Sequence, residues 1–273
     1  MKYAEDFREI ARNALKGKWR LSALVGFLAA LMGGGLGVNS PSLDLNSNSE
    51  STSNIIENLN INIGPEAMKI ILILLLVLLV WVIVLIVISG AATLGYAVFN
   101  LKLIDGEEVS THDLFSQFNR IGDGFWMNFG VGLYIFLWSI LFVVPGIIKS
   151  YSYSMTPFIM AENPGMKVDA AITESRRIMD GNKWRLFCLN FSFIGWQLLC
   201  LIPDIISLFV SLYLVMVTGN YGFLLLLIPC GIPSFIGGLF LRPYMTAAVT
   251  AFYREIRFEK VIPEIAPAPD QMD

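Results

Sequence analysis

The chain has 273 residues, of which 55% are hydrophobic and 15% are charged. Soluble domains carry about 25% charged residues, so this chain lacks the charge that a fully water-facing surface needs. Its net charge of -3 offers no basic excess for a nucleic acid, and no nucleic-acid partner is expected.

Metal and disulfide chemistry is also not expected. The cysteines Cys188, Cys200 and Cys230 all lie within apolar runs. An odd number without paired spacing argues against a disulfide framework or a metal cluster. The single histidine, His112, lies in a polar segment without a Cys or His nearby. We therefore predict no metal and no cofactor.

Residues 2–16 are predicted to form an amphipathic helix, because apolar residues recur there at helical spacing between charged ones. Gly17 follows, where a helix end favours a residue that tolerates positive φ. Such a helix is expected to lie in the lipid headgroup region with its apolar face toward the acyl chains. Trp19 then anchors the start of a first crossing over residues 21–38. A cleaved signal peptide is disfavoured because three acidic residues precede this segment.

Residues 39–66 are rich in Ser and Asn and contain no Lys or Arg, which predicts a polar loop on the outer side of a membrane. The strongest apolar signal follows it. Ile70–Ile88 contains only Ile, Leu, Val and one Trp, and at about 1.5 Å per residue it spans roughly 28 Å. We predict the second crossing over residues 68–99.

The middle of the chain repeats the pattern of surface helix and crossing. Residues 110–121 are predicted to form an interfacial helix, with Ser110 and Asp113 as a capping pair. Trp126 anchors a third crossing over 125–145, which Pro145 is expected to end. Residues 147–161 are predicted to return through the membrane.

The last third of the chain again shows a surface helix followed by crossings. Residues 164–180 are predicted to form an interfacial helix that ends at Gly181, and Trp184 follows as an anchor. Crossings are predicted over residues 186–217 and 222–253. Residues 262–273, which are rich in Pro, are predicted to form a disordered tail.

These segments predict an all-α polytopic membrane helical bundle in a single domain, residues 1–261. About six transmembrane helices form three hairpins, each preceded by a cytoplasmic amphipathic interfacial helix. Sixteen of the 19 Lys and Arg residues lie in 1–20, 100–124, 162–185 and 254–260. This bias predicts a multi-pass protein of the cell membrane with both termini in the cytoplasm. A seven-helix alternative with a turn at Pro203–Asp204 is disfavoured, because it would place the last basic cluster outside.

Polar residues within the apolar segments give a candidate site. Asn190, Gln197, Asp204 and Ser211 are seven residues apart, so they form one helical stripe that should face the bundle interior. By the predicted topology, Lys149 and Arg242 could meet Asp204 in the outer half of the bundle. The set could join helices together, bind an anionic headgroup or solute, or carry protons. The candidate intramembrane polar site therefore comprises Lys149, Asn190, Gln197, Asp204 and Arg242.

Catalysis is not expected. The chain has no H-E-x-x-H, G-x-S-x-G or phosphate-loop motif. Only one Asp lies within an apolar stretch, so a membrane aspartyl pair is not available. No histidine could activate a buried Ser or Cys. We therefore predict that the protein is not an enzyme and has no catalytic residues.

Several segments resemble one known family: Leu94–Leu101, Asp113–Phe115, Pro145–Lys149, Ser175–Trp184, Leu189–Trp196 and Pro243–Tyr253. It is the domain of unknown function 975 family of multi-pass membrane proteins, common in Gram-positive bacteria. The resemblance covers nearly the whole chain and implies localisation and architecture only. The chain departs from the family in the long region between Asp204 and Ile236. More distantly, the motifs resemble the membrane portion of some glycerophosphodiester phosphodiesterases.

The sequence thus predicts an integral membrane protein of unknown molecular function, most simply a non-enzymatic accessory or scaffold protein. Its expected partners are membrane lipids, with a membrane protein as a second candidate, contacted through the apolar faces around Phe7, Phe118 and Ile172. The alternative is a transporter or lipid-handling protein whose polar site contains Lys149, Asp204 and Arg242.

Overall fold

The computed structural model describes residues 3–34, 65–219, 222 and 227–265. Over these ranges it is helical without strands, which confirms the predicted all-α class. The outer loop predicted for residues 39–66 lies outside the described residues, apart from Pro65 and Glu66. In chain order the helices are α1 (Ala4–Leu15), α2 (Trp19–Leu31), α4 (Pro65–Asp105), α5 (His112–Phe115), the 3-10 turn η1 (Phe118–Arg120), α6 (Ile121–Leu141), α7 (Val143–Tyr153), α8 (Thr156–Glu162), α9 (Val168–Ile178), α10 (Lys183–Phe191), α11 (Ile194–Thr218) and α12 (Leu227–Ile265).

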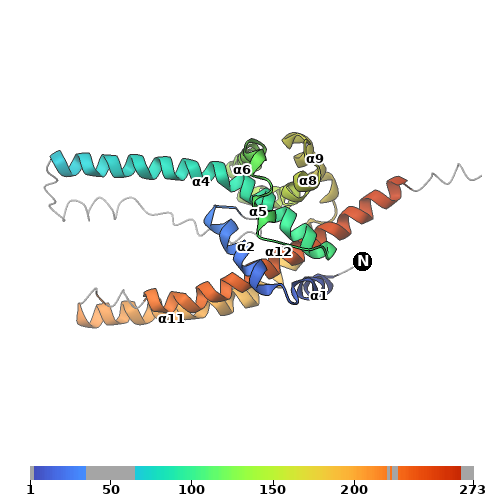
Figure 1. Cartoon of the computed structure of the whole chain (residues 1–273). Coiled ribbons are helices and arrows are strands. Elements are labelled where there is room, and N and C mark those ends of the chain that lie inside the picture. Colours follow the sequence, from blue (N-terminus) through green and yellow to red (C-terminus); the bar gives the residue numbers. More distant parts are fainter. Residues whose placement is uncertain (1–2, 35–64, 220–221, 223–226, 266–273) are drawn as a thin grey trace, which may run out of the picture.

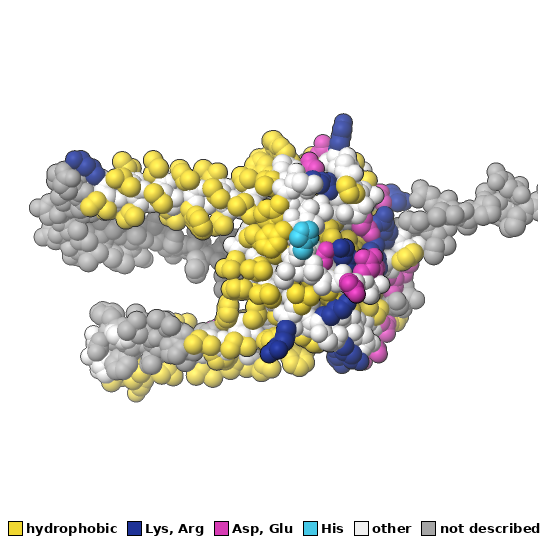
Figure 2. All heavy atoms as spheres, in the orientation of Figure 1, with side chains coloured by type: hydrophobic (Ala, Val, Ile, Leu, Met, Phe, Trp, Pro, Cys, Tyr) yellow, Lys and Arg dark blue, Asp and Glu magenta, His cyan; other side chains and the backbone are white. Residues whose placement is uncertain are grey.

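The helices form a packed body from which two apolar arms project in the same direction (Figure 1). One arm is the N-terminal half of α4, and the other pairs α11 with the first half of α12. The second half of α12 runs through the body and contacts α1, α4, α9 and α10. Charged side chains gather at the end of the body that lies away from the arms (Figure 2).

Four helical segments are long and apolar enough to cross a membrane: Met68–Asp105, His112–Leu141, Lys183–Thr218 and Ile232–Glu259. The predicted layout of six crossings is not confirmed, because α2 has 13 residues and α7 has 11. At about 1.5 Å per residue they span roughly 20 and 17 Å, well short of the roughly 30 Å hydrocarbon core.

The first predicted crossing, residues 21–38, ends earlier in the structure. Helix α2 stops at Leu31, and Gly33 adopts a positive φ of 70°. The run of glycines at 33–35 explains this end, because glycine is among the poorest helix formers. Gly34 lies against α4, where an added Cβ would come within 2.8 Å of the Ala92 Cβ. Residues 35–38 lie outside the described residues.

The turn predicted at Pro145–Gly146 lies earlier, at Phe142, whose φ of -159° and ψ of 140° separate α6 from α7. Pro145 instead occupies the first turn of α7. Backbone N–H groups there have no acceptor within the helix, so a residue without an N–H is tolerated. Gly146 packs so closely on α6 that a Cβ would lie 2.2 Å from Ser139 Oγ. The return crossing predicted over 147–161 is divided into α7 and α8 at Ser154–Met155.

Helix α1 confirms the amphipathic helix predicted for residues 2–16, but its apolar face does not point to lipid. Phe7 is only 2% exposed, and its ring packs edge-on against Phe252 of α12, with 5.4 Å between centroids. Ala11 and Leu15 are fully buried in the same core. The expected lipid-facing surface is therefore an internal packing surface.

The other two predicted interfacial helices are also corrected. Helix α9 covers most of 164–180, but its apolar face, including Ile172, is buried against the body. The segment 110–121 contains only the four-residue α5 and the turn η1, with Phe118 partly buried. The capping pair is confirmed in part, because the Ser110 backbone N–H donates to Asp113 Oδ2 at 2.7 Å.

The last two predicted crossings correspond to longer helical units. The segment 186–217 is formed by α10 and α11, which are separated at Ser192–Phe193. Helix α12 extends beyond the predicted crossing 222–253 and reaches Ile265. Residues 262–265 are therefore helical, which differs from the predicted disordered tail. They extend a helix that apolar residues such as Ile256 hold in the core. Residues 266–273 lie outside the described residues.

Candidate functional site

Part of the polar stripe predicted on the fifth crossing contacts α12. Ser207 and Ser211 are the two buried residues of α11. Gln197 Nε2 donates a hydrogen bond to Met245 Sδ of α12 at 3.3 Å. Asn190 lies one heptad earlier, on α10, and its Oδ1 is buried without a hydrogen-bond partner among the described residues. The stripe thus contributes to the contact between the paired helices.

Asp204 lies on this stripe between Gln197 and Ser211 and is only partly buried. Within the part of the chain that the structure describes, no ion pair reaches its carboxylate. The helices approach closely beside it, since a Cβ on Gly237 would lie 2.6 Å from Cys200 Sγ. Asp204 therefore lies in the α11–α12 pair without a countercharge from the described helices.

Arg242 lies in a different neighbourhood, where α12 meets α4. Its charge interacts with the buried Tyr96 side chain, and its carbonyl oxygen accepts a hydrogen bond from Thr246 Oγ1 at 3.0 Å. Tyr96 lies beside Thr246 and Asn100. Arg242 therefore borders a small polar cluster that links α12 to α4.

Lys149 occupies a third neighbourhood. Helix α7 packs against α6, α9 and α10. The Lys149 Nζ lies 4.6 Å from the centroid of the Trp138 ring, an arrangement that permits a cation–π interaction. Its charge also interacts with those of Arg176 and Lys183. The hydrogen bonds and ion pairs of the described residues join no two of Lys149, Asp204 and Arg242, and each lies among different neighbours.

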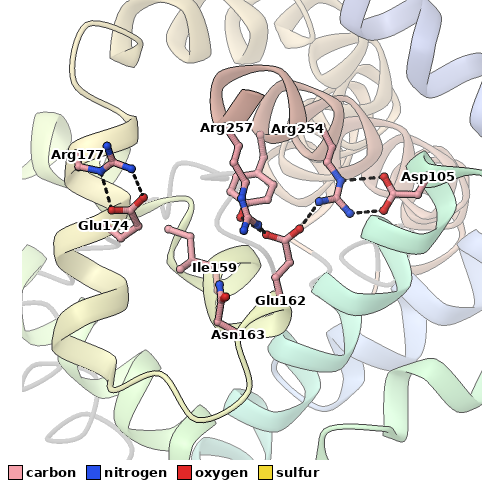
Figure 3. Close-up of polar contacts among 9 residues, drawn as sticks. Asp105, Ile159, Glu162, Asn163, Glu174, Arg177, Arg254 and Arg257 are labelled. Carbon is pink, nitrogen blue, oxygen red and sulfur yellow. Dashed lines mark hydrogen bonds and ion pairs between the residues drawn. The ribbon is translucent and has the colours of Figure 1, made fainter. Parts of the chain in front are cut away.

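The structure instead contains an ion-pair network that the sequence analysis missed (Figure 3). Arg254 of α12 binds Asp105 at the end of α4 through two nitrogens, and Nε donates to Oδ1 at 2.9 Å. Arg254 also pairs with Glu162 of α8, which accepts from Arg257 and from the Tyr253 hydroxyl. The four charged residues of the network are Asp105, Glu162, Arg254 and Arg257.

A second set of ion pairs ties α10 to α12. Arg185 donates to Glu255 Oε1 at 2.8 Å and to Glu259 Oε2 at 3.0 Å. The Arg185 side chain is 17% exposed and that of Glu255 is 13% exposed, so water screens this pair less than a surface pair. Together with the network around Glu162, these contacts hold the ends of α4, α8 and α10 around α12.

The sequence contained a signal for these contacts. Arg254, Arg257 and Glu259 follow the buried Phe252 and Tyr253 at spacings that a continuing helix would place on adjacent faces. Because residues 254–260 lie beyond the predicted last crossing, their charges indicate topology and no contact. The partners of Arg254 are 149 and 92 residues away, which no local pattern could reveal.

The predicted tryptophan anchors differ in exposure. Trp126 is 60% exposed and Trp184 is 71% exposed, consistent with positions at a membrane interface. Trp19 is instead partly buried against the core, with its ring centroid 6.1 Å from that of Tyr244. Two of the three anchors are therefore free to contact lipid.

Within the described ranges, no group of three or more His, Cys, Asp and Glu side chains is placed to hold a metal ion. Residues 135–260 match the model of a family described as "Protein of unknown function (DUF975)". This match confirms the resemblance inferred from the sequence over residues 135–260, and the segments Leu94–Leu101 and Asp113–Phe115 lie outside it. The description assigns no activity. The comparisons with curated proteins and with solved structures gave no match.

Proposed function

We propose that this chain, whose residues 135–260 match the DUF975 family model, is a multi-pass integral membrane protein with a non-enzymatic accessory or scaffolding role. The N-terminal half of α4, which we call its outer half, supports the membrane assignment most strongly. An 18-residue window of this helix has a mean hydropathy of 3.8, and none of it is buried within the protein. Water would solvate such a surface poorly, whereas lipid acyl chains match it.

The distribution of charge supports an orientation with both termini in the cytoplasm. The ion pairs around Glu162 and Arg185 lie at the ends of α4, α8 and α10 that gather around the second half of α12. Helix α1 packs against the same part of α12. Basic residues concentrate in cytoplasmic segments of membrane proteins, and the segment 39–66 contains none.

The accessory role requires a different contact surface from the one predicted from the sequence. The apolar faces of α1 and α9 are occupied by the protein's own core, so they cannot also bind a partner. Their opposite faces are polar and exposed, and include Glu5, Glu9 and Arg12 on α1. We place the partner contact on these polar faces.

Labelling of single cysteines tests the membrane assignment. In a variant whose three cysteines are replaced by Ala, a cysteine is introduced in place of Glu5, Ser47 or Glu259. A membrane-impermeant maleimide applied to intact cells should label only the variant at position 47, and the other two should react after permeabilisation. Labelling of position 5 or 259 from outside, or extraction of the chain by alkaline carbonate, would contradict the proposal.

A second experiment separates the accessory role from transport. Quantitative affinity purification from native membranes should give the same stoichiometric partner for the unmodified chain and for Asp204→Asn. A Glu5→Lys/Glu9→Lys double variant should lose that partner while remaining in the membrane. Solute uptake by proteoliposomes that Asp204→Asn abolishes would instead establish the transporter alternative.

A further inference from the structure

Three basic residues from three helices converge on one side of the body. Lys149 of α7 interacts electrostatically with Arg176 of α9 and with Lys183 at the start of α10. Packing contacts fix the helices that carry these residues. In the first contact, Ser175 Oγ donates a hydrogen bond to the Ser152 carbonyl oxygen at 2.8 Å, which joins α9 to α7. The basic cluster is therefore defined as Lys149, Arg176 and Lys183.

The contact between α7 and α10 places the third member of the basic cluster independently. The rings of Tyr151 and Phe187 meet edge-on, with 6.1 Å between their centroids. Tyr151 is two residues after Lys149, and Phe187 is one helical turn after Lys183. The three cations are therefore brought together by helix packing, and they do not depend on flexible loops.

Among the described residues, no ion pair joins the basic cluster to an acidic side chain, including the exposed Asp180 between Arg176 and Lys183. The nearest acid along α9, Glu174, is bound through both carboxylate oxygens by Arg177, at 2.8 Å each. Most other arginines of the body, including Arg120, Arg185, Arg254 and Arg257, form ion pairs with acids. Like charges held close together repel, so an anion that binds between them is stabilised.

The border of the basic cluster is apolar and aromatic. Trp138 lies under the Lys149 ammonium group. Trp184 follows Lys183 and stacks on Phe187, with 5.0 Å between ring centroids, while remaining 71% exposed. Ile148 is 48% exposed beside Lys149. Cations next to exposed tryptophan and aliphatic side chains match a molecule with an anionic head and an apolar tail.

We propose that the basic cluster binds the phosphate group of an anionic phospholipid, with the acyl chains lying along Trp184 and the exposed side of α7. This inference depends on the membrane embedding proposed above, but not on the accessory role. Of the five residues of the candidate intramembrane polar site, only Lys149 belongs to the basic cluster. Phosphatidylglycerol is the probe that we use for this chemistry.

The test compares lipid retention by native mass spectrometry after reconstitution into nanodiscs of equal phosphatidylcholine and phosphatidylglycerol. The unmodified protein should retain phosphatidylglycerol preferentially. Each single change, Lys149→Gln, Arg176→Gln or Lys183→Gln, should lower this preference about fivefold, since a Lys or Arg near an anionic surface contributes about that factor. The triple variant should show no preference.

Two matched controls keep the test specific. Arg12→Gln/Lys16→Gln/Arg20→Gln removes the same charge from exposed positions near the N-terminus and should retain the preference. Lys149→Arg/Arg176→Lys/Lys183→Arg keeps the charge and should also retain it. Equal retention by the unmodified protein and the Gln triple variant, or an equal loss in the Arg12 control, would overturn the proposal.

A soluble anion distinguishes the two sources of phosphate. Inorganic phosphate at millimolar concentration should not displace the retained phosphatidylglycerol, because it lacks the acyl chains that contact the apolar border. Displacement would overturn the lipid assignment in favour of a free-anion site. A chain that inserts into the bilayer but shows no lipid preference would refute this inference alone, whereas a chain that fails to insert would refute the membrane embedding as well.

Discussion

The two halves of α4 belong to one continuous helix but have opposite surroundings. From Met68 to Val84 every side chain is exposed, on all sides of the helix. From Gly90 to Ala97 every residue is buried. Apart from Lys69 and Trp81, the outer half consists of large apolar residues without rings, whereas the inner half is rich in Gly and Ala.

The difference shows which apolar residues pack against protein in this fold. Small residues let helix backbones approach closely, and they are enriched where membrane helices pack together. A Cβ on Gly90 would lie 2.1 Å from the Gly124 carbonyl carbon, and one on Gly95 would lie 1.9 Å from the Leu114 carbonyl oxygen. Large aliphatic residues without such contacts remain on the outer half, where lipid can solvate them.

The largest effect is expected from truncating a core side chain. Phe252→Ala should lower stability by about 3–5 kcal/mol, because Phe252 is fully buried against Phe7 and the ring leaves a cavity. Leu75→Ala in the outer half of α4 is the matched control, because Leu75 is 57% exposed, and it should change stability by less than about 0.5 kcal/mol. Thermal unfolding in detergent measures both. Equal losses would remove the distinction between the two halves.

Adding one methyl group to the close helix contact should have the next largest effect. Gly95→Ala would push α4 away from the Leu114 backbone and should cost about 3 kcal/mol. Gly132→Ala on α6 meets nothing within 4 Å and should be neutral or slightly stabilising. Unfolding midpoints of the two variants check this. A Gly95→Ala protein as stable as the unmodified one would show that the close approach is not required.

The ion-pair network should contribute a smaller amount. Glu162→Gln removes the negative charge shared by Arg254 and Arg257 and replaces one carboxylate oxygen with an NH2 donor. It should cost about 2 kcal/mol, since the Glu162 side chain is only 15% exposed. Glu174→Gln breaks the more exposed pair with Arg177 and should cost no more than about 0.5 kcal/mol. If high salt reduces the two effects equally, the Glu162 network is no better protected from solvent than the surface pair.

The smallest effect on stability is expected at Asp204. Because no described residue pairs with its carboxylate, Asp204→Asn should change the unfolding midpoint by less than one degree or raise it slightly. Gln197→Leu, which removes the hydrogen bond to Met245, provides a comparison on the same stripe. A marked loss of stability in Asp204→Asn alone would show that Asp204 has a structural partner after all.

The sequence predicted the parts of the fold that depend on local patterns. The apolar run at Ile70–Ile88 and the glycine that ends α1 are both present, and Ser211 of the predicted polar stripe is buried. The neighbours of each amphipathic face could not be predicted. A helical apolar stripe such as that around Phe7 is suited equally to lipid and to a protein core, and only the position of α12 decides between them.

The residues of the candidate site lie apart for a related reason. The topology predicted from charge places Lys149, Asp204 and Arg242 in the outer half of the bundle, where they could meet. The turn at Phe142 and the short α7 place Lys149 beside α9 and α10 instead. The residues that do meet, such as Arg254 with Asp105, are too far apart in sequence for spacing to indicate contact.

Spin labels on α4 test the central claim most directly, namely that its outer half faces lipid on all sides and its inner half faces protein. Single labels at positions 74, 75, 76 and 77 cover one helical turn, and labels at 94 and 97 report the inner half. In a reconstituted bilayer, the first four should all collide readily with oxygen, which partitions into lipid, and rarely with a water-soluble nickel chelate. The labels at 94 and 97 should be shielded from both. Shielding on one side of the turn at 74–77 would reveal a protein partner, and accessibility to the nickel chelate there would contradict the membrane embedding.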